Sequence, residues 1–376
     1  MNILITGARA PISADIARAL VQTGHQVFLT DSLRHPIGRF TPGIAGYLRL
    51  APPRPDVQAF QEDLLRSVTK YGIDLVIPTS EEVFWLAQVK QWPTGCQLFA
   101  PSAQVLSLLH DKGAFGQLAN TLGIGAGLSH NLGEPEQVER FLQDNDPGEF
   151  VFKRIFSRFA TDVHISPSEQ TVRALPFEPG NPWLAQPRAR GPEVCLYNIA
   201  KNGELLLHVA YRPRWRAGKG ASVYFEPVED VSLKALSAQV AQATNFTGQL
   251  SFDVIQTASG PVVLECNPRG TSGVHLAAQY PQLLSQAFGG ATVELPKLAP
   301  RMLALPLLMY QPGLFACKDG RAGWRAGTDA MREAGVPLHG QALATAELLI
   351  RAATTQSNPL AASTADIEWN GHGLVA

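Results

Sequence analysis

The sequence predicts a mixed protein, α/β near its N-terminus and α+β in its middle. Over the first hundred residues, short apolar runs alternate with longer amphipathic runs, which is typical of parallel βαβ units. After Pro101 the apolar runs come in pairs. One pair flanks Asn202 and Gly203, two residues that favour the tight turn of an antiparallel hairpin. We therefore expect a doubly wound parallel sheet followed by an antiparallel region.

The N-terminal elements follow from apolar spacing and from turn residues. Strands are expected at residues 2–6, 26–30, 75–78 and 98–100. Helices are expected at residues 13–22, 57–71 and 81–89. Ligands of a doubly wound sheet bind at the carboxyl ends of its strands, so the residues after each strand are candidates for a site.

The later elements are of both kinds. Helices are expected at residues 104–122, near 135–143 and at 233–244. Strands are expected at residues 150–153, 183–187, 194–200 and 205–211, and a second hairpin at 248–256 and 260–266. The tail after residue 291 is rich in Ala and Leu, and we expect it to be mostly helical.

Charge and composition limit the class of partner. The 376 residues contain 31 Lys and Arg and 32 Asp and Glu, so the formal net charge is −1. This balance gives no electrostatic footprint for nucleic acid or for an anionic membrane. The sequence shows no membrane-spanning apolar run, no signal-peptide pattern and no cysteine spacing typical of disulfides or zinc. We expect a cytoplasmic protein with small-molecule substrates, and we leave a homodimer open.

The turn after the first strand suits phosphate at a helix N-terminus, and Asp31, after the second strand, could hydrogen-bond a ribose. Only Gly7 is present, however, where a dinucleotide fingerprint needs three glycines. Tyr197 and Lys201 have the spacing of a dehydrogenase pair, but they lie in a predicted strand, where that spacing separates them. An NAD(P)-dependent oxidoreductase is therefore the weaker alternative.

The second hairpin carries the most informative polar residues. Asp253 interrupts an apolar strand, and Glu265 and Asn267 follow the next one two residues apart, so they share a face. If the two strands pair, Asp253 faces Glu265. Three oxygen donors on one sheet face suit Mg²⁺, with Mn²⁺ as an alternative. Arg269 then offers a planar fork to a phosphate or carboxylate.

Two lysines precede this hairpin in the sequence. Lys112 follows Asp111 on a predicted helix, and Lys153 ends an apolar strand. A lysine at the end of an apolar strand is poorly explained by core packing and well explained by a phosphate that reaches it from a cleft. After Lys153 come Ser157, Arg158 and Thr161, in a stretch without glycine.

The order of these residues resembles the ATP-grasp superfamily, and most closely its branch with biotin carboxylase and carbamoyl-phosphate synthetase. The resemblance implies an N-terminal Rossmann-like (pre-ATP-grasp) domain, a two-lobed ATP-grasp fold and a C-terminal extension. The implied boundaries are 1–103 for the first domain, 104–187 for the small lobe with central helices, 188–290 for the large lobe and 291–376 for the extension.

The resemblance also implies a nucleotide site. Lys112 and Lys153 would contact the phosphates of ATP, with Ser157 nearby. Glu193 would lie near the nucleotide in the large lobe. The residues implied beside the adenine, through their backbone groups, are Leu184, Ala185 and Gln186. This sequence departs from the family pattern in two places, because Pro187 follows Gln186 where many members have Glu, and because the loop after Lys153 lacks glycine.

The same resemblance implies the chemistry. Asp253, Glu265 and Asn267 would hold one or two Mg²⁺ ions, and Arg269 and Lys153 would be the catalytic residues. The implied enzyme is a biosynthetic carboxylate–amine ligase, or carboxylate–thiol ligase, that forms an acyl phosphate and releases ADP and phosphate. A non-catalytic nucleotide-binding protein on the same scaffold is a further alternative.

Two other features could belong to the acceptor side. His275 follows Arg269 closely and either lines the acceptor pocket or packs as an ordinary histidine. Arg212, Arg214 and Arg216 either steer an anionic substrate or form a solvated loop.

Overall fold

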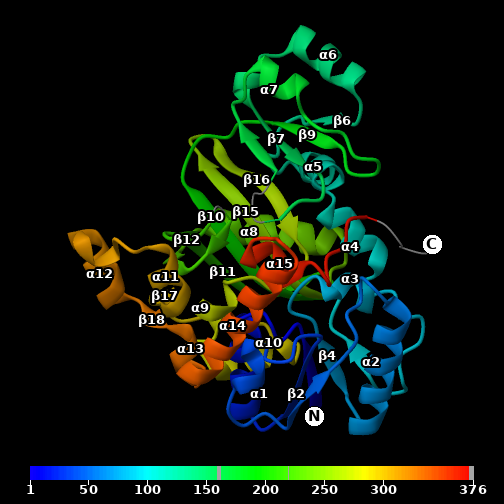
Figure 1. Cartoon of the computed structure of the whole chain (residues 1–376), viewed down its shortest axis with the longest axis vertical. Coiled ribbons are helices and arrows are strands. Elements are labelled where there is room, and N and C mark those ends of the chain that lie inside the picture. Colours follow the sequence, from blue (N-terminus) through cyan, green and yellow to red (C-terminus); the bar gives the residue numbers. More distant parts are fainter. Residues whose placement is uncertain (159–161, 219, 372–376) are drawn as a thin grey trace.

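The computed structural model describes residues 1–158, 162–218 and 220–371. Its elements form three main sheets and a set of C-terminal helices (Figure 1). In that view the N-terminal sheet lies at the bottom, the smallest of the three at the top and the largest between them. Within the described ranges, no helix has the length and apolar character needed to cross a membrane.

The N-terminal sheet is parallel and has the order β3-β2-β1-β4-β5. Its strands are β1 (Asn2–Thr6), β2 (Gln26–Asp31), β3 (Gly46–Arg49), β4 (Leu75–Ile77) and β5 (Gln97–Leu98). The helices of this unit are α1 (Ile12–Gln22), α2 (Val57–Tyr71) and α3 (Glu82–Leu86), with a short 3₁₀ turn η1 (Ile37–Phe40). The predicted doubly wound sheet is confirmed, and β3 is an additional strand.

This sheet is apolar on both faces because helices cover both. Ile3 and Ile5 pack on the α1 side, and Leu4 packs on the α2 side against Leu64. A strand buried on both faces reads as a continuous apolar run, as residues 2–6 do. The core on the α1 side continues into the largest sheet, so that the N-terminal unit and that sheet share one hydrophobic core.

The predicted helix 104–122 is two helices, α4 (Ala103–His110) and α5 (Lys112–Thr121). Asp111 between them has extended backbone angles, and its carboxylate accepts hydrogen bonds from the N–H groups of Gly113 and Ala114 at 2.8 and 2.9 Å. An aspartate in this position satisfies N–H groups that a helix start leaves unpaired. The prediction of one helix was wrong at this point, and the break makes Lys112 the first residue of α5.

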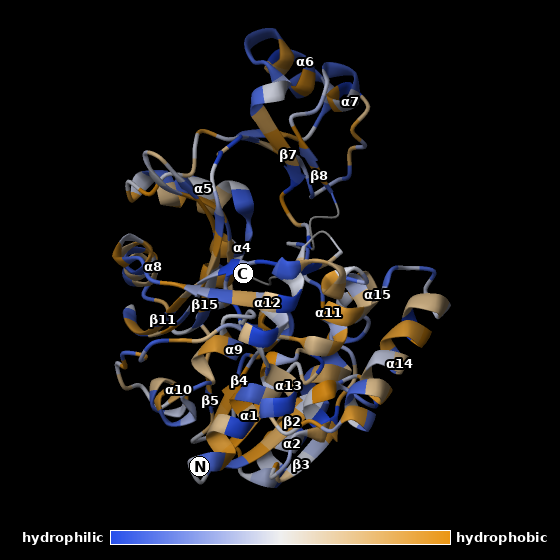
Figure 2. Ribbon diagram, turned by 90° about the vertical axis from the view of Figure 1, so that its left-hand side faces the viewer, coloured by the Kyte–Doolittle hydropathy of each residue, from blue (hydrophilic) through white to orange (hydrophobic). Residues whose placement is uncertain are grey.

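The second sheet has the order β6-β9-β7-β8 and is antiparallel. Its strands are β6 (His130–Leu132), β7 (Phe150–Arg154), β8 (Val163–Ile165) and β9 (Trp183–Pro187). The helices α6 (Pro135–Asp144) and α7 (Glu169–Arg173) belong to this unit, and η2 (Pro147–Glu149) precedes β7. Val138 and Phe141 of α6 pack against the strands, and Figure 2 shows the opposite side of α6 as hydrophilic.

The largest sheet has the order β16-β15-β10-β11-β14-β17-β18. Its strands are β10 (Glu193–Lys201), β11 (Glu204–Pro213), β14 (Tyr224–Val228), β15 (Gly248–Thr257), β16 (Gly260–Asn267), β17 (Arg301–Met302) and β18 (Thr328–Asp329). Both predicted hairpins are confirmed as the antiparallel pairs β10–β11 and β15–β16. Asn202 and Gly203 have φ of 51° and 80°, as the predicted tight turn requires. The helix α8 (Val231–Ala243) covers one face.

The remaining elements close the other sides of the molecule. A short pair, β12 (Arg216–Ala217) and β13 (Ala221–Ser222), follows β11, and α9 (Val274–Ala277) and α10 (Pro281–Phe288) follow β16. The C-terminal helices are α11 (Ala304–Tyr310), α12 (Lys318–Ala326), α13 (Ala330–Glu333), α14 (Leu338–Thr354) and α15 (Pro359–Thr364), with η3 (Leu314–Ala316). The predicted helical tail is present, but it also adds β17 and β18 to the largest sheet.

Candidate functional site

A cavity of about 600 Å³ lies where residues of the second sheet, the largest sheet and the N-terminal unit meet. Most of the residues singled out in the sequence line it. They are Lys112, Lys153, Ser157, Gln186, Glu193, Asp253, Glu265, Asn267 and Arg269. A cavity of this size with a few convergent polar groups is the usual form of a small-molecule site.

Lys112 is fixed at the start of α5 and is only 6% exposed. Its Nζ donates to the carbonyl oxygens of Ile155 and Ser157, at 3.1 and 3.2 Å, and lies 3.2 Å from Glu265 Oε2. The lysine therefore joins the loop after β7 to the acidic end of β16. A buried ammonium needs partners of this kind.

Lys153 reaches the same region from β7. Its Nζ donates to the carbonyl oxygen of Leu264 at 2.8 Å, next to Glu265. The pKa of Lys153 is lowered to about 8, chiefly by burial and also by the Lys112 charge, while Glu265 and Asp253 oppose the shift. The two lysines thus place two cations beside one pair of carboxylates.

The carboxylates lie side by side on adjacent strands, as predicted. Asp253 of β15 pairs in register with Glu265 of β16, and the side-chain amide of Asn267 lies 3.5 Å from Asp253 Oδ2. Burial and the neighbouring Glu265 charge raise the pKa of Asp253 to about 7. Burial alone would raise the pKa of Glu265 as well, but Lys112 and Lys153 lower it to about 2.

This donor set fits a divalent cation. Two crowded carboxylates and an amide oxygen supply the hard oxygen ligands that Mg²⁺ prefers. A cation between them would also relieve the repulsion between two buried acids. Asp253, Glu265 and Asn267 are therefore one set of described residues that could hold such a cation.

The predicted adenine-side segment lies in β9. Leu184 and Ala185 are 1% and 0% exposed and pack in hydrophobic clusters, and β9 is bonded on both sides, to β6 and β7. Neither residue lines the cavity, because Ala185 lies in the core of the second sheet and Leu184 in a cluster with Phe84 and Trp369. Contact with adenine through their backbone groups stays a prediction. The cavity wall begins one residue later, with Gln186, and continues through Pro187, Arg188 and Ala189.

Gln186 is the largely buried first residue of this wall. Its side-chain amide donates to the carbonyl oxygens of Ala126 and Val263, at 3.0 and 3.3 Å, and so ties β9 to β16 and to the chain after α5. It is 4% exposed. The segment that can face a ligand is therefore the one that follows it.

Glu193 lies on the cavity wall opposite and accepts a hydrogen bond from Arg216 at 2.5 Å. The structure adds Cys195 to this group, because Cys195 pairs in register with Asp253 and lines the cavity. Ligand atoms of Glu193, Cys195 and Asp253 lie within 4.8 Å of one another. The positions of the cysteines in the sequence do not predict that Cys195 lies near Asp253, because this depends on how β10 and β15 pair.

Sequence reasoning missed Glu81, whose side chain is 1% exposed and faces the cavity from the end of the N-terminal sheet. Arg158 Nε lies 2.5 and 2.6 Å from its two oxygens, and Arg269 Nη2 lies 3.8 Å away. Burial alone would raise the pKa of Glu81, but Arg158 lowers it to about 2, with a further contribution from Arg269. Its place at a strand end was the available signal.

Ser157 lies at the cavity, whereas His275 is buried away from it. Ser157 lines the cavity and its hydroxyl donates to the Arg154 carbonyl oxygen at 3.2 Å. Thr161 lies outside the described residues. His275 is 2% exposed and its Nδ1 lies 2.5 Å from Asp15 Oδ2, so it packs as a buried pair between α9 and α1.

Arg212, Arg214 and Arg216, at the end of β11 and just beyond it, differ in whether they reach the cavity. Arg216 reaches the cavity through Glu193. Arg214 is paired instead with Glu226, at 2.5 Å, and with Asp319 of α12. Only Arg216 of the three lines the cavity among the described residues.

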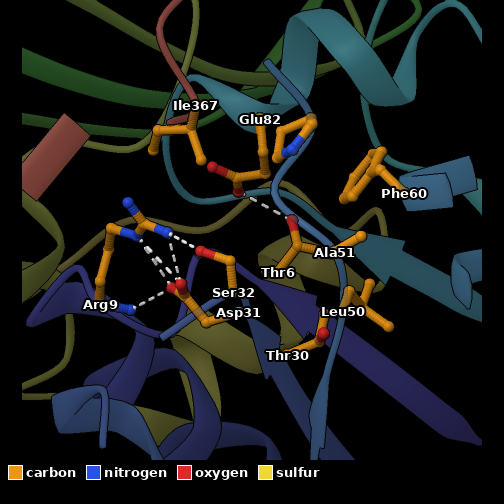
Figure 3. A pocket seen from close by; sticks show the side chains of 12 residues that line it. Thr6, Arg9, Thr30, Asp31, Ser32, Leu50, Ala51, Phe60, Glu82 and Ile367 are labelled. Atoms are coloured by element: carbon orange, nitrogen blue, oxygen red, sulfur yellow. Dashed lines mark hydrogen bonds and ion pairs between the residues drawn. The ribbon is translucent and has the colours of Figure 1, made fainter. Parts of the chain in front are cut away.

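The turn after β1 does not offer a dinucleotide site. Figure 3 shows Asp31, the residue predicted to meet a ribose, bound by Arg9, with Nη2 at 2.6 Å from Oδ1. The cavity at this place is about 20 Å³ and Ile367, from the C-terminal part of the chain, lines it. Such a volume is that of a water molecule.

The proposed dehydrogenase pair is also excluded by its surroundings. Tyr197 is fully buried in β10 and its hydroxyl donates to Gln249 Oε1 at 2.8 Å. It therefore has a structural partner and no access to the cavity. Lys201 lies at the far end of the same strand.

Comparisons with known proteins bear on the fold of the chain. No family model matches the chain. The arginine-specific large chain of carbamoyl phosphate synthase from Eremothecium gossypii is 26% identical over 226 residues, which is 54% of this chain. The match covers only 20% of that relative's length.

Solved structures are similar over most of the chain. The N5-carboxyaminoimidazole synthetase of Staphylococcus aureus, complexed with ADP, has a TM-score of 0.64 and 14% identity, and the match covers 84% of this chain and 86% of that one. The biotin carboxylase domain of Hydrogenobacter thermophilus 2-oxoglutarate carboxylase, with MgADP and bicarbonate, has a TM-score of 0.60 and 13% identity, over 79% and 71%.

The phosphoribosylamine–glycine ligase of Thermotoga maritima is similar at a TM-score of 0.59 and 14% identity, over 80% of this chain and 78% of that one. All three are ATP-grasp ligases. Identities this low establish the fold alone. The three sheets, in the order in which this chain builds them, give it the fold of the ATP-grasp ligases.

Proposed function

We propose that the protein is an ATP-dependent ligase that joins a carboxylate to an amine, or less commonly a thiol, through an acyl phosphate. One observation carries the proposal. Two buried lysines and three oxygen ligands, borne on different elements, converge on one cavity of about 600 Å³. The likeness to ligases that bind ADP or MgADP supports it.

The lysines would bind the phosphates of ATP. Lys112 now pairs with Glu265, and Lys153 with the Leu264 carbonyl oxygen, so both ammonium groups point to the acidic end of β16. A polyphosphate bound together with its cation would replace Glu265 and the Leu264 carbonyl oxygen as the partners of the two lysines. No buried charge would then be left unpaired. Positioning and charge neutralisation are the main work of a protein in phosphoryl transfer.

Asp253, Glu265 and Asn267 would hold Mg²⁺ or Mn²⁺, which neutralises charge on the phosphates when bound. The base would lie against the wall formed by residues 186–189. Pro187 has no N–H group to offer, so hydrogen bonds to the base must come from its neighbours or from carbonyl oxygens.

The reaction would proceed in two steps. An oxygen of the substrate carboxylate attacks the γ-phosphorus of ATP, the bond to the bridging oxygen breaks, and ADP leaves. The nitrogen of the amine then attacks the acyl carbon, phosphate leaves, and the amine gives up its proton. Arg269 would hold the transferred phosphoryl group through both steps, with a fork that matches its oxygens.

We also propose the domain limits 1–103, 104–187, 188–290 and 291–376 for the N-terminal domain, small lobe, large lobe and C-terminal extension. The small-molecule carboxylate and amine, the cytoplasmic location and a homodimer belong to the same proposal.

The test is an ADP-release assay on the purified chain with MgATP and pools of carboxylates and amines. ADP release that requires both pools supports the ligase. Glu265→Gln should abolish release and leave the fold intact, whereas Glu136→Gln, on the exposed side of α6, should change nothing. Unchanged release by Glu265→Gln would contradict the metal assignment.

One observation favours a second candidate, a nucleotide-binding protein without turnover. The wall beside the base carries Pro187, and the loop after Lys153 has no glycine to bring its backbone close to phosphates. MgATP binding without ADP release to any carboxylate and amine pair would select this candidate.

A further inference from the structure

The last described residues return to the N-terminal unit after α15 (Figure 1). Asp366 Oδ1 lies 2.5 Å from Arg9 Nη1, and Trp85 Nε1 donates to the Ile367 carbonyl oxygen at 2.8 Å. Figure 3 shows Ile367 beside Arg9, where Asp366 also binds. This segment, Asp366–Asn370, is therefore anchored on the sheet whose strand ends face the cavity.

Trp369 fixes the segment from its other side. It is 1% exposed, and its ring stacks on Phe84 of α3 at 4.8 Å between centroids and 12° between planes. Its ring also packs against His110 and Phe156. His110 lines the large cavity, so Trp369 forms the layer of side chains behind the cavity wall.

The segment binds both members of the ion pair at the cavity end. The Trp369 carbonyl oxygen accepts from Arg158 Nη2 at 2.6 Å, and Asn370 Oδ1 accepts from Arg158 Nη1 at 2.8 Å. The Trp369 N–H donates to Glu81 Oε2 at 3.3 Å. Arg158 and Glu81 are thereby held against one another by a third part of the chain.

Glu81 in turn faces Arg269. Its Oε1 lies 3.8 Å from Arg269 Nη2, and Arg269 Nη1 makes a longer hydrogen bond, 3.3 Å, to the Gly270 carbonyl oxygen. The Arg269 side chain is 22% exposed and lines the cavity. A long side chain held so loosely loses much rotamer entropy on binding unless a neighbouring charge fixes its direction beforehand.

We propose that Asp366–Asn370 is a positioning element of the site: it holds Arg158 and Glu81 together, and through Glu81 it directs the Arg269 guanidinium into the cavity. The inference rests on the proposed function, in which Arg269 binds the transferred phosphoryl group. Glu81, Arg158, Trp369 and Asn370 are positioning residues, because they act through Arg269.

The test measures inorganic phosphate binding by calorimetry, with and without MgADP. Asn370→Ala removes one acceptor from Arg158 at a partly exposed position, so the fold is expected to persist. Phosphate affinity should fall about tenfold, the usual effect of removing a supporting partner from a site. Asn370→Asp keeps an acceptor for the guanidinium and should restore wild-type phosphate affinity.

Asn358→Ala is the matched control. Asn358 is an asparagine of the same region, and its Oδ1 caps α15 by accepting from Ala361 N at 2.9 Å. Its replacement should lower the melting temperature and leave phosphate affinity unchanged. A general loosening of the C-terminal region would instead affect phosphate binding in both alanine variants.

Unchanged phosphate affinity in Asn370→Ala, or an equal loss in Asn370→Ala and Asn370→Asp, would overturn the inference. So would a wild-type protein that binds no phosphate in either condition. MgADP affinity is read separately in the same titrations. Absence of MgADP binding would count against the proposed function. The titration with phosphate alone would still decide the role of the segment.

Discussion

Most of the carboxylates that line the cavity lie beside a cation. Among these described acids, Glu81 binds Arg158 and Glu265 binds Lys112, whereas Asp253 has no cation within salt-bridge distance. Burial makes an unpaired charge costly, and it accordingly contributes to raising the pKa of Asp253. At the scale of the residue, the place where positive charge is missing is the place where the metal is proposed.

The Glu81–Arg158 pair predicts an acid-sensitive contribution to stability. The pKa of Glu81 is about 2 in the folded chain against an ordinary 4.5, so the unfolded chain takes up the proton first as the pH falls. The contribution is therefore complete above pH 4.5 and is lost as the pH falls from about 4.5 to 2. Its size corresponds to about 3 kcal/mol.

Glu81→Gln should lower the free energy of unfolding at pH 7 by about this amount and flatten its dependence on pH below 4.5. Denaturant unfolding at several pH values measures both effects. Glu136→Gln, an exposed acid on α6, is the control and should change neither. An acid profile of Glu81→Gln equal to that of the wild type would contradict the assignment.

The residues that sequence reasoning found are those whose signal is local. Asp253 and Glu265 interrupt apolar strands, and a turn brings those strands into register, so their meeting follows from short-range pattern. The one local signal of Glu81 is its place after the end of β4, and it does not interrupt an apolar strand. Its partners Arg158 and Trp369 are distant in the sequence, and only the tertiary fold brings them together.

At the scale of the element, the break between α4 and α5 matters most for the site. In a continuous helix, Lys112 would lie in the helix interior. The direction of its side chain would then be set by its position around the helix axis. The Asp111 cap instead starts a new helix at Lys112 and directs its Nζ to Glu265. Helical spacing alone predicted one helix because apolar residues continue through the break.

Asp111→Ala tests this element. Loss of the cap should cost about 1 kcal/mol of stability and should also weaken MgATP binding, because it shifts Lys112. Ser102→Ala removes the cap of α4, where Ser102 Oγ accepts from Val105 N, and should cost a similar stability without affecting nucleotide. Equal nucleotide affinity in the two variants would refute a role for the cap in the site.

Apart from β14, which lies inside the largest sheet, the strands that sequence reasoning missed are short and lie at or near sheet edges. β3 is the edge strand of the N-terminal sheet, and the two-residue strands β17 and β18 end the largest sheet. Such strands form because a longer neighbour offers unpaired backbone groups, and their own sequence needs little β preference.

At the scale of the whole molecule, the cavity is assembled from separate parts. The second sheet supplies Lys153, the largest sheet supplies Asp253 and Glu265, and the N-terminal unit supplies Glu81. A ligand that contacts residues from all three parts would stabilise their arrangement relative to the ligand-free chain. Ligand binding to the folded chain stabilises it through this kind of linkage.

Hydrogen exchange tests this assembly. MgATP should slow amide exchange in residues 150–158, 186–189 and 253–269, which line or adjoin the cavity. The helix α2, which packs on the far face of the N-terminal sheet, should exchange at the same rate with and without nucleotide. Protection confined to one sheet would show that the nucleotide does not join the parts.

The central claim is that this cavity binds ATP together with a divalent cation held by Asp253, Glu265 and Asn267. A calorimetric titration of the purified chain with ATP, with Mg²⁺ and again with a chelator, tests it most directly. The claim predicts saturable binding with Mg²⁺ that weakens strongly in the chelator and in Glu265→Gln. Absence of ATP binding with Mg²⁺, or equal affinity in all three conditions, would contradict it.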